Sequence, residues 1–118
     1  MRRGAWIAQQ HGRKAVLYVV RVYGGGECFY KVGITFSLSS RFSRLKTVYQ
    51  WRTVARFSSW DAGKVWDLEQ RLHVAFSALS YTPLSPFSGK TECYAEVAEL
   101  LAALPVGAFF LKNSKTLI

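Results

Sequence analysis

The sequence predicts an α+β domain in which a small, three-stranded antiparallel sheet is flanked by about three helices. Two β-prone runs separated by glycines predict a hairpin, and a later alternating segment predicts a third strand. Three stretches with apolar residues at helical spacing predict the helices. The chain has 118 residues, of which 50% are hydrophobic. Domains cluster at roughly 100 to 150 residues, so we expect one core and one functional site.

The hairpin is predicted for residues 17–23 and 28–34, which are rich in β-branched and aromatic side chains. Three consecutive glycines, residues 24–26, lie between these runs. Glycine supplies the positive φ that tight hairpin connections require. The two runs should therefore pair as neighbouring antiparallel strands.

The next three elements follow from capping and spacing. Serines before residue 41 can cap a short, basic, amphipathic helix over residues 41–48. Residues 51–60 alternate between apolar and polar, as a half-exposed strand does. Asp61 can cap the longest helix, whose apolar stripe runs from Val65 to Leu79.

The C-terminal third is expected to hold a loop and one more helix. Residues 80–90 contain two prolines and a glycine and predict a loop, after which Thr91 can cap a last helix with an inward face over residues 97–104. Residues 108–111 could add one more edge strand. The expected organisation is a basic arm at residues 1–14, the domain at residues 15–107, and a tail or edge strand at residues 108–118.

The formal net charge of +9 predicts an anionic partner such as nucleic acid or an acidic membrane surface. No run reaches the roughly 20 apolar residues of a spanning helix, and residues 1–14 lack the apolar core of a signal peptide. We therefore expect a cytoplasmic protein that does not enter the membrane. Its two cysteines are far apart in the sequence, so neither a zinc site nor a disulfide framework is predicted.

Four short elements follow one another in a set order. They are Leu17-Tyr18-Val19, Lys31-Val-Gly33-Ile-Thr35, Arg41, and Glu69 within Leu68-Glu-Gln-Arg-Leu-His73. This pattern resembles the GIY-YIG nuclease superfamily over about residues 17–94. The lysine in place of the second motif's tyrosine, the Leu-Glu-x-x-Leu-His helix and the stretch at residues 91–94 resemble a branch common in phages and bacterial mobile elements.

In that superfamily, the hairpin strands carry the two motifs, the next helix carries an arginine, and a later helix carries a metal-binding glutamate. The resemblance implies a metal-dependent endonuclease that hydrolyses DNA phosphodiester bonds with a single Mg²⁺ or Mn²⁺. It implies that Tyr18 activates water, that Arg41 and Lys31 steady the phosphate, and that Glu69 holds the metal. The chain departs from the pattern where Lys31 replaces a tyrosine and Cys93 replaces an aromatic residue.

The same residue types suit this chemistry on their own account. Phosphodiester hydrolysis requires an activated water, neutralisation of the charge on the phosphate, and help for the departing oxygen. Tyr18 could serve as the base if Lys31 or Arg41 stabilises its phenolate. The ordinary alternatives are a core tyrosine, a solvated strand lysine and a surface arginine.

Glu69 is expected at the rim of the apolar stripe, where a carboxylate is costly unless it has a partner or a metal. His73 follows one helical turn later and shares this face, which would allow metal contact, phosphate contact or proton transfer. A structural ion pair and a structural histidine are the alternatives. Glu92 is expected in the first turn of the last helix, where the helix dipole already favours an acid, so only the family pattern makes it a site residue.

Four basic residues are candidates for binding a phosphate backbone, because they cluster around the first helix and the strand that follows it. They are Arg44, Lys46, Arg52 and Arg56. The alternation of the strand places Arg52 and Arg56 on one outer face. The expected partner is double- or single-stranded DNA, bound by a monomer or by a homo-oligomer that cuts both strands. A non-cutting DNA-binding or regulatory module and a tryptophan-based protein-interaction domain are the alternative hypotheses.

Overall fold

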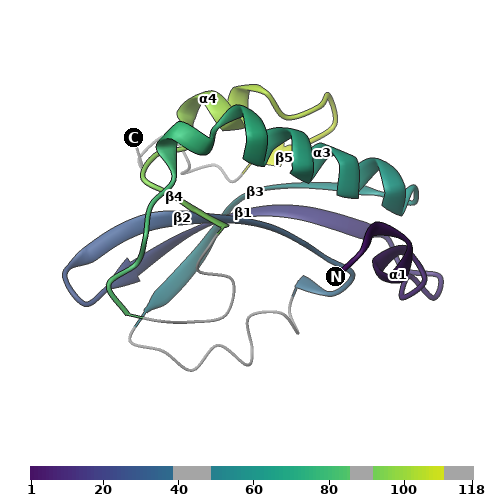
Figure 1. The fold of residues 1–118 in the computed structure, drawn as a ribbon, viewed down its shortest axis with the longest axis horizontal. Coiled ribbons are helices and arrows are strands. Elements are labelled where there is room, and N and C mark those ends of the chain that lie inside the picture. Colours follow the sequence, from purple (N-terminus) through teal and green to yellow (C-terminus); the bar gives the residue numbers. More distant parts are fainter. Residues whose placement is uncertain (39–48, 86–91, 111–118) are drawn as a thin grey trace.

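The computed structural model describes residues 1–38, 49–85 and 92–110. Its helices are α1 (Arg3–Ile7), α3 (Ala62–Ala75) and α4 (Ala98–Ala102), with a 3-10 turn, η1 (Ser77–Leu79). Its strands are β1 (Ala15–Gly24), β2 (Glu27–Thr35), β3 (Gln50–Ser59), β4 (Cys93–Tyr94) and β5 (Phe109–Phe110). Figure 1 shows α3 and α4 on one face of the sheet. Among the described residues, no helix has the length and apolar character needed to cross a membrane.

Over the described residues, the sheet has five strands in the order β4-β2-β1-β3-β5, and each of their pairings is antiparallel. The prediction of a three-stranded sheet is therefore wrong, although the α+β class stands. The two added strands lie at the edges and contain two residues each. Strand β5 lies within residues 108–111, where an edge strand was expected, whereas β4 was not predicted and is too short to reveal a period of two. Cys93 and Tyr94 were assigned to a helix, whereas α4 begins only at Ala98. The proposed cap, Thr91, lies outside the described residues.

The predicted hairpin is confirmed by the pairing of β1 with β2. Gly24, Gly25 and Gly26 all have positive φ, at 135°, 59° and 82°. Gly24 pairs with Glu27, so Gly25 and Gly26 form a two-residue turn that suits the twist of the strands. The register places Tyr18 opposite Gly33 and brings the two motif strands side by side.

The main core lies between α3 and one face of the sheet. Leu17 and Val19 from β1 and Val32 from β2 join Val65 and Leu68 from α3 in one buried cluster. These residues alternate along the strands and recur at helical spacing along α3, as the sequence predicted. Each such side chain stabilises the fold by about 1.5–3 kcal/mol when it is fully buried. The face of α3 turned to the sheet is thereby fixed.

The start of α3 is confirmed, and its end is earlier than predicted. The Asp61 carboxylate accepts a hydrogen bond from the Lys64 amide at 3.1 Å, which satisfies one free N–H of the first turn. The helix ends at Ala75, and the apolar stripe that was predicted to reach Leu79 continues into η1. The apolar residues at helical spacing therefore continue beyond the last residue of the helix.

The N-terminal residues 1–14, which the sequence assigned to a basic arm, include the short helix α1. Its Arg3 guanidinium donates to both carboxylate oxygens of Asp67 on α3, at 2.9 and 3.1 Å. Trp6 is buried and stacks on Phe36, with ring centroids 4.3 Å apart. These aromatic contacts form between segments far apart in the sequence, which local periodicity does not show.

Strand β3 contains a bulge that changes which of its residues face the core. Ala55 pairs with Val19, but Thr53 pairs with Val20, which leaves Val54 as an extra residue. As a result, Val54 and Ala55 are both buried although they are consecutive. The strict alternation predicted for this strand therefore fails at Val54.

The opposite face of the sheet carries a second apolar cluster. Its buried members are Tyr18, Val20, Val22, Phe29, Tyr49 and Cys93, with Leu38 and Tyr81 packed against them. At the hairpin end, the Glu27 carboxylate accepts hydrogen bonds from the Tyr49 and Tyr81 hydroxyls, each at 2.5 Å, and from the Leu84 amide at 3.2 Å. Glu27 thus ties two distant segments to the hairpin.

The Glu27 contacts make one pH-dependent contribution to stability. Although desolvation raises the pKa of Glu27, the three hydrogen bonds outweigh it and hold this pKa below its usual value of 4.5. A carboxyl with a lowered pKa stabilises the fold above the unfolded pKa and loses that contribution as the pH falls.

We therefore predict that Glu27→Gln lowers the melting temperature at pH 7. The difference in melting temperature between variant and wild type should narrow as the pH falls below about 4.5, where the wild-type carboxylate becomes protonated and loses its charge. Thermal denaturation followed by circular dichroism between pH 7 and pH 3 measures both. An exposed control, Glu96→Gln, should melt like wild type at every pH, and a Glu27→Gln deficit that stays constant into acid would contradict the assignment.

Candidate functional site

Tyr18 and Lys31 form a buried polar pair on the hairpin. Lys31 is 2% exposed, and its Nζ donates a hydrogen bond to the Tyr18 hydroxyl at 2.8 Å. The register explains the contact, because Lys31 pairs with Val20 and Tyr18 with Gly33, so the two side chains are diagonal neighbours on one face. The sequence could name both residues but could not supply this register.

The glycine of the second motif makes room for the tyrosine of the first. A Cβ added at Gly33 would lie 2.7 Å from Cζ of Tyr18 and 3.1 Å from Nζ of Lys31. Real Cβ atoms do not approach ring carbons so closely. Gly33 is therefore needed for the phenol to lie across β2 and reach the lysine.

Lys31 also contacts an acid from a distant part of the chain. Its Nζ lies 3.2 Å from Oε2 of Glu92, whose side chain is 35% exposed. A buried ammonium is costly unless it is paired and hydrogen-bonded, and Glu92 supplies the opposite charge. The pairing of Lys31 with Cys93 sets Glu92 at this edge of β2. Burial raises the pKa of the Cys93 thiol to about 12, so this thiol stays protonated and is no nucleophile.

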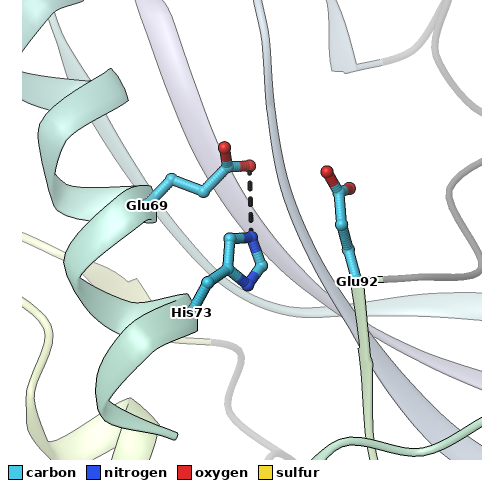
Figure 2. A group of neighbouring side chains, drawn as sticks. All are labelled: Glu69, His73 and Glu92. Atoms are coloured by element: carbon cyan, nitrogen blue, oxygen red, sulfur yellow. Dashed lines mark ion pairs between the residues drawn. The ribbon is translucent and has the colours of Figure 1, made fainter. Parts of the chain in front are cut away.

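Glu69 and His73 lie one turn apart on α3, as predicted. Glu69 is 5% exposed, and its Oε2 lies 3.7 Å from Nε2 of His73 (Figure 2). His73 Nδ1 is hydrogen-bonded to the hydroxyl of Tyr94 in β4. Burial, with the carboxylates of Glu92 and Glu69, raises the pKa of Tyr94 to about 12, so its phenol stays neutral. Tyr94 thus orients the imidazole without adding charge.

Glu92 faces the two α3 residues from across the site. Figure 2 shows the Glu92 side chain beside Glu69 and His73, on the segment that enters β4. One ligand atom from each of the three residues lies within 4.8 Å of the others. Two carboxylates and an imidazole are ordinary ligands for a divalent cation. Because Glu69 is buried and His73 Nε2 lacks a hydrogen-bond partner within the described residues, the group fits such an ion.

The contacts therefore form one connected site with Glu92 at its centre. On one side, Glu92 accepts a hydrogen bond from Lys31, which in turn donates to Tyr18. On the other side, Glu92 lies near Glu69 and His73, which could be metal ligands. The sequence placed Glu92 in a helical first turn, whereas it directly precedes β4. The helix dipole therefore does not explain the acid at this position, whereas its ion pair with Lys31 does.

Of the predicted basic residues, the structure describes Arg52 and Arg56, and it does not bring these two together. Arg41, Arg44 and Lys46 lie outside the described residues. On β1, the partner of Arg52 is Arg21 and the partner of Arg56 is Tyr18. These two β1 residues are an odd number of positions apart, so their side chains point to opposite faces of the sheet. The bulge at Val54 therefore puts Arg52 and Arg56 on opposite faces of the sheet, so the prediction of a shared face is wrong. Arg56 instead lies over the ring of Phe109, with Cζ 5.0 Å from the ring centroid.

Tyr94 is the site residue that sequence reasoning missed. The residue was visible within the stretch at residues 91–94, but nothing in the sequence gave it a role. Its role follows from its contact with His73, which needs β4 to pair with β2. The signal in the sequence was its position two residues after Glu92.

No known family is matched. Comparison of the chain with protein-family models, with curated proteins and with solved structures gives no match in any of the three. The functional interpretation therefore depends on the geometry of the site and on the chemistry of its residues.

The fit between Gly33 and Tyr18 predicts a position-specific cost. Gly33→Ala should lower the free energy of unfolding by about 1–3 kcal/mol, because the added methyl displaces the phenol from the lysine. Urea denaturation of the purified variant measures this. The matched control is Gly4→Ala in α1, where nothing lies within 4 Å of an added Cβ. The control should be neutral or slightly stabilising, and equal effects at the two positions would contradict the packing account.

Proposed function

We propose that this protein is a metal-dependent endonuclease that hydrolyses the phosphodiester bonds of DNA. One observation carries the proposal. Glu92 contacts the buried pair of Tyr18 and Lys31, and it is also one of three potential metal ligands that lie together. The order of motif residues, which resembles the GIY-YIG superfamily, supports the same chemistry. The net charge of +9 suits an anionic polymer.

The proposed reaction divides between the two sides of the site. Glu69 would hold a divalent cation, which would supply Lewis-acid neutralisation of charge on the phosphate. Tyr18 takes the proton of the attacking water, and for this its hydroxyl must be ionised. The Lys31 ammonium at 2.8 Å is placed to stabilise that phenolate. The water oxygen forms a new bond to phosphorus as the bond to the departing sugar oxygen breaks, and that oxygen leaves with the bonding pair and takes up a proton from solvent.

This assignment makes a demand on the fold around Tyr18. Its side chain has no exposed surface, and Leu38 and Tyr81 pack against the cluster to which it belongs. A general base must come within hydrogen-bond reach of the water it deprotonates. Binding of DNA must therefore displace part of the cover over Tyr18, so that the phenol meets the phosphate beside Glu92.

The burial of Tyr18 also favours a second candidate function. A protein that keeps the phenol covered would bind DNA without cutting it, as a DNA-binding or regulatory module. Lys31 would then be a structural counterion for Glu92. This candidate predicts salt-sensitive DNA binding and no cleavage product with any metal.

Cleavage assays separate the two candidates. Supercoiled plasmid and short single-stranded DNA are incubated with wild type and with Glu69→Gln, each with Mg²⁺, Mn²⁺ or excess chelator. We predict metal-dependent cleavage by wild type and a loss of at least about 10²-fold in rate for the variant, which loses the carboxylate that would hold the cation against the phosphate. Glu99→Gln, on the exposed surface of α4, is the matched control and should cut at the wild-type rate.

The outcome that contradicts the nuclease is specific. Intact DNA in every lane, together with a salt-sensitive gel shift by wild type, would favour the binding module. Equal cleavage by wild type and Glu69→Gln would show that the nuclease activity does not use this site.

A further inference from the structure

We propose that Glu69, His73 and Glu92 bind one divalent transition-metal ion together, with His73 Nε2 as a ligand and with Mn²⁺ preferred over Mg²⁺. The inference deepens the proposed function, and it rests on that function for what the ion does. It extends the resemblance, which assigns only a glutamate to the metal. It also gives Glu92 a second role beside its ion pair with Lys31.

The contacts of the two ring nitrogens of His73 identify Nε2 as the ligand atom. Nδ1 is occupied by the Tyr94 hydroxyl, and Nε2 is buried with no hydrogen-bond partner among the described residues. Leaving a buried ring nitrogen unpaired is unfavourable. Metal-binding histidines commonly use one nitrogen for the ion and fix the other through a neighbouring group. Tyr94 holds His73 in this arrangement.

The two carboxylates complete a three-sided site. Glu69 is buried, and its Oε2 lies 3.7 Å from His73 Nε2. Its Oε1 accepts only a weak hydrogen bond, at 3.5 Å, from the side-chain Nε2 of Gln70. Two ligands held at about 2.0–2.2 Å from one ion are at most roughly 4.4 Å apart. The observed spread is within 4.8 Å, so a small rotation of the partly exposed Glu92 side chain closes the site.

The ligand set selects the class of ion. Imidazole nitrogen favours transition metals, whereas Mg²⁺ prefers oxygen ligands and retains its waters. The charges also agree, because two carboxylates and the Lys31 ammonium leave one net negative charge for the cation. After binding, the site carries one net positive charge. It would then attract a phosphate, which links the ion to the proposed substrate.

Metal binding is measured without DNA by calorimetric titration of the full chain with MnCl₂ and with MgCl₂. Wild type should bind Mn²⁺ at least about 10-fold more tightly than Mg²⁺. His73→Asn should lose at least about 10-fold in Mn²⁺ affinity, because asparagine is too short to place its amide where Nε2 lies. His11→Asn, at the chain's other and exposed histidine, is the matched control and should bind like wild type.

A second measurement needs no variant. Pulsed electron paramagnetic resonance of Mn²⁺ bound to wild type should show coupling to an imidazole ¹⁴N nucleus. Absence of this coupling, or wild-type Mn²⁺ affinity in a folded His73→Asn, would overturn the inference. DNA cleavage that survives in variants without measurable Mn²⁺ binding would support the ligand set and overturn the metal dependence of the proposed nuclease. Intact Mn²⁺ binding without any cleavage would overturn the nuclease and support the ligand set.

Discussion

The ammonium of Lys31 is the constraint around which the site is organised. It is almost completely buried. A buried cation without partners would destabilise the fold by more than most single interactions stabilise it. The Tyr18 hydroxyl and the Glu92 carboxylate meet this demand from β1 and from the segment before β4. The lysine thus joins the hairpin to a short edge strand that contributes little hydrogen bonding of its own. Glu92, once held there, lies opposite Glu69 and His73 on α3.

The consequence for function is a site that requires the whole sheet edge to be in place. Gly33 leaves room for Tyr18, the hairpin register sets Lys31 beside it, and β4 brings both Glu92 and Tyr94. Tyr94 then fixes the imidazole of His73. Loss of β4 pairing would remove an acid from the metal side and the counterion from the lysine at once. The activity of the proposed endonuclease would therefore depend on the two-residue strand β4.

Local patterns in the sequence predicted the elements that local forces decide. The glycine turn, the Asp61 cap and the shared helix face of Glu69 and His73 each involve residues within a few positions of one another. The edge strand β4, the bulge at Val54 and the ion pair of Lys31 with Glu92 depend on pairings across the sheet. A one-residue bulge reverses the face of every residue beyond it. For that reason the expectation for Arg52 and Arg56 failed while the strand itself was found.

The most direct test of this account is a double-mutant cycle on the free energy of unfolding, with Lys31→Met, Glu92→Gln and the double variant measured by urea denaturation. If Lys31 is held by Glu92, removing either partner should make the second substitution less costly. The account predicts a coupling energy of at least about 0.5 kcal/mol, towards the low end of the range because Glu92 is partly exposed. Additive effects of the two substitutions would contradict it, because the lysine would then be held without the acid that connects it to the metal ligands.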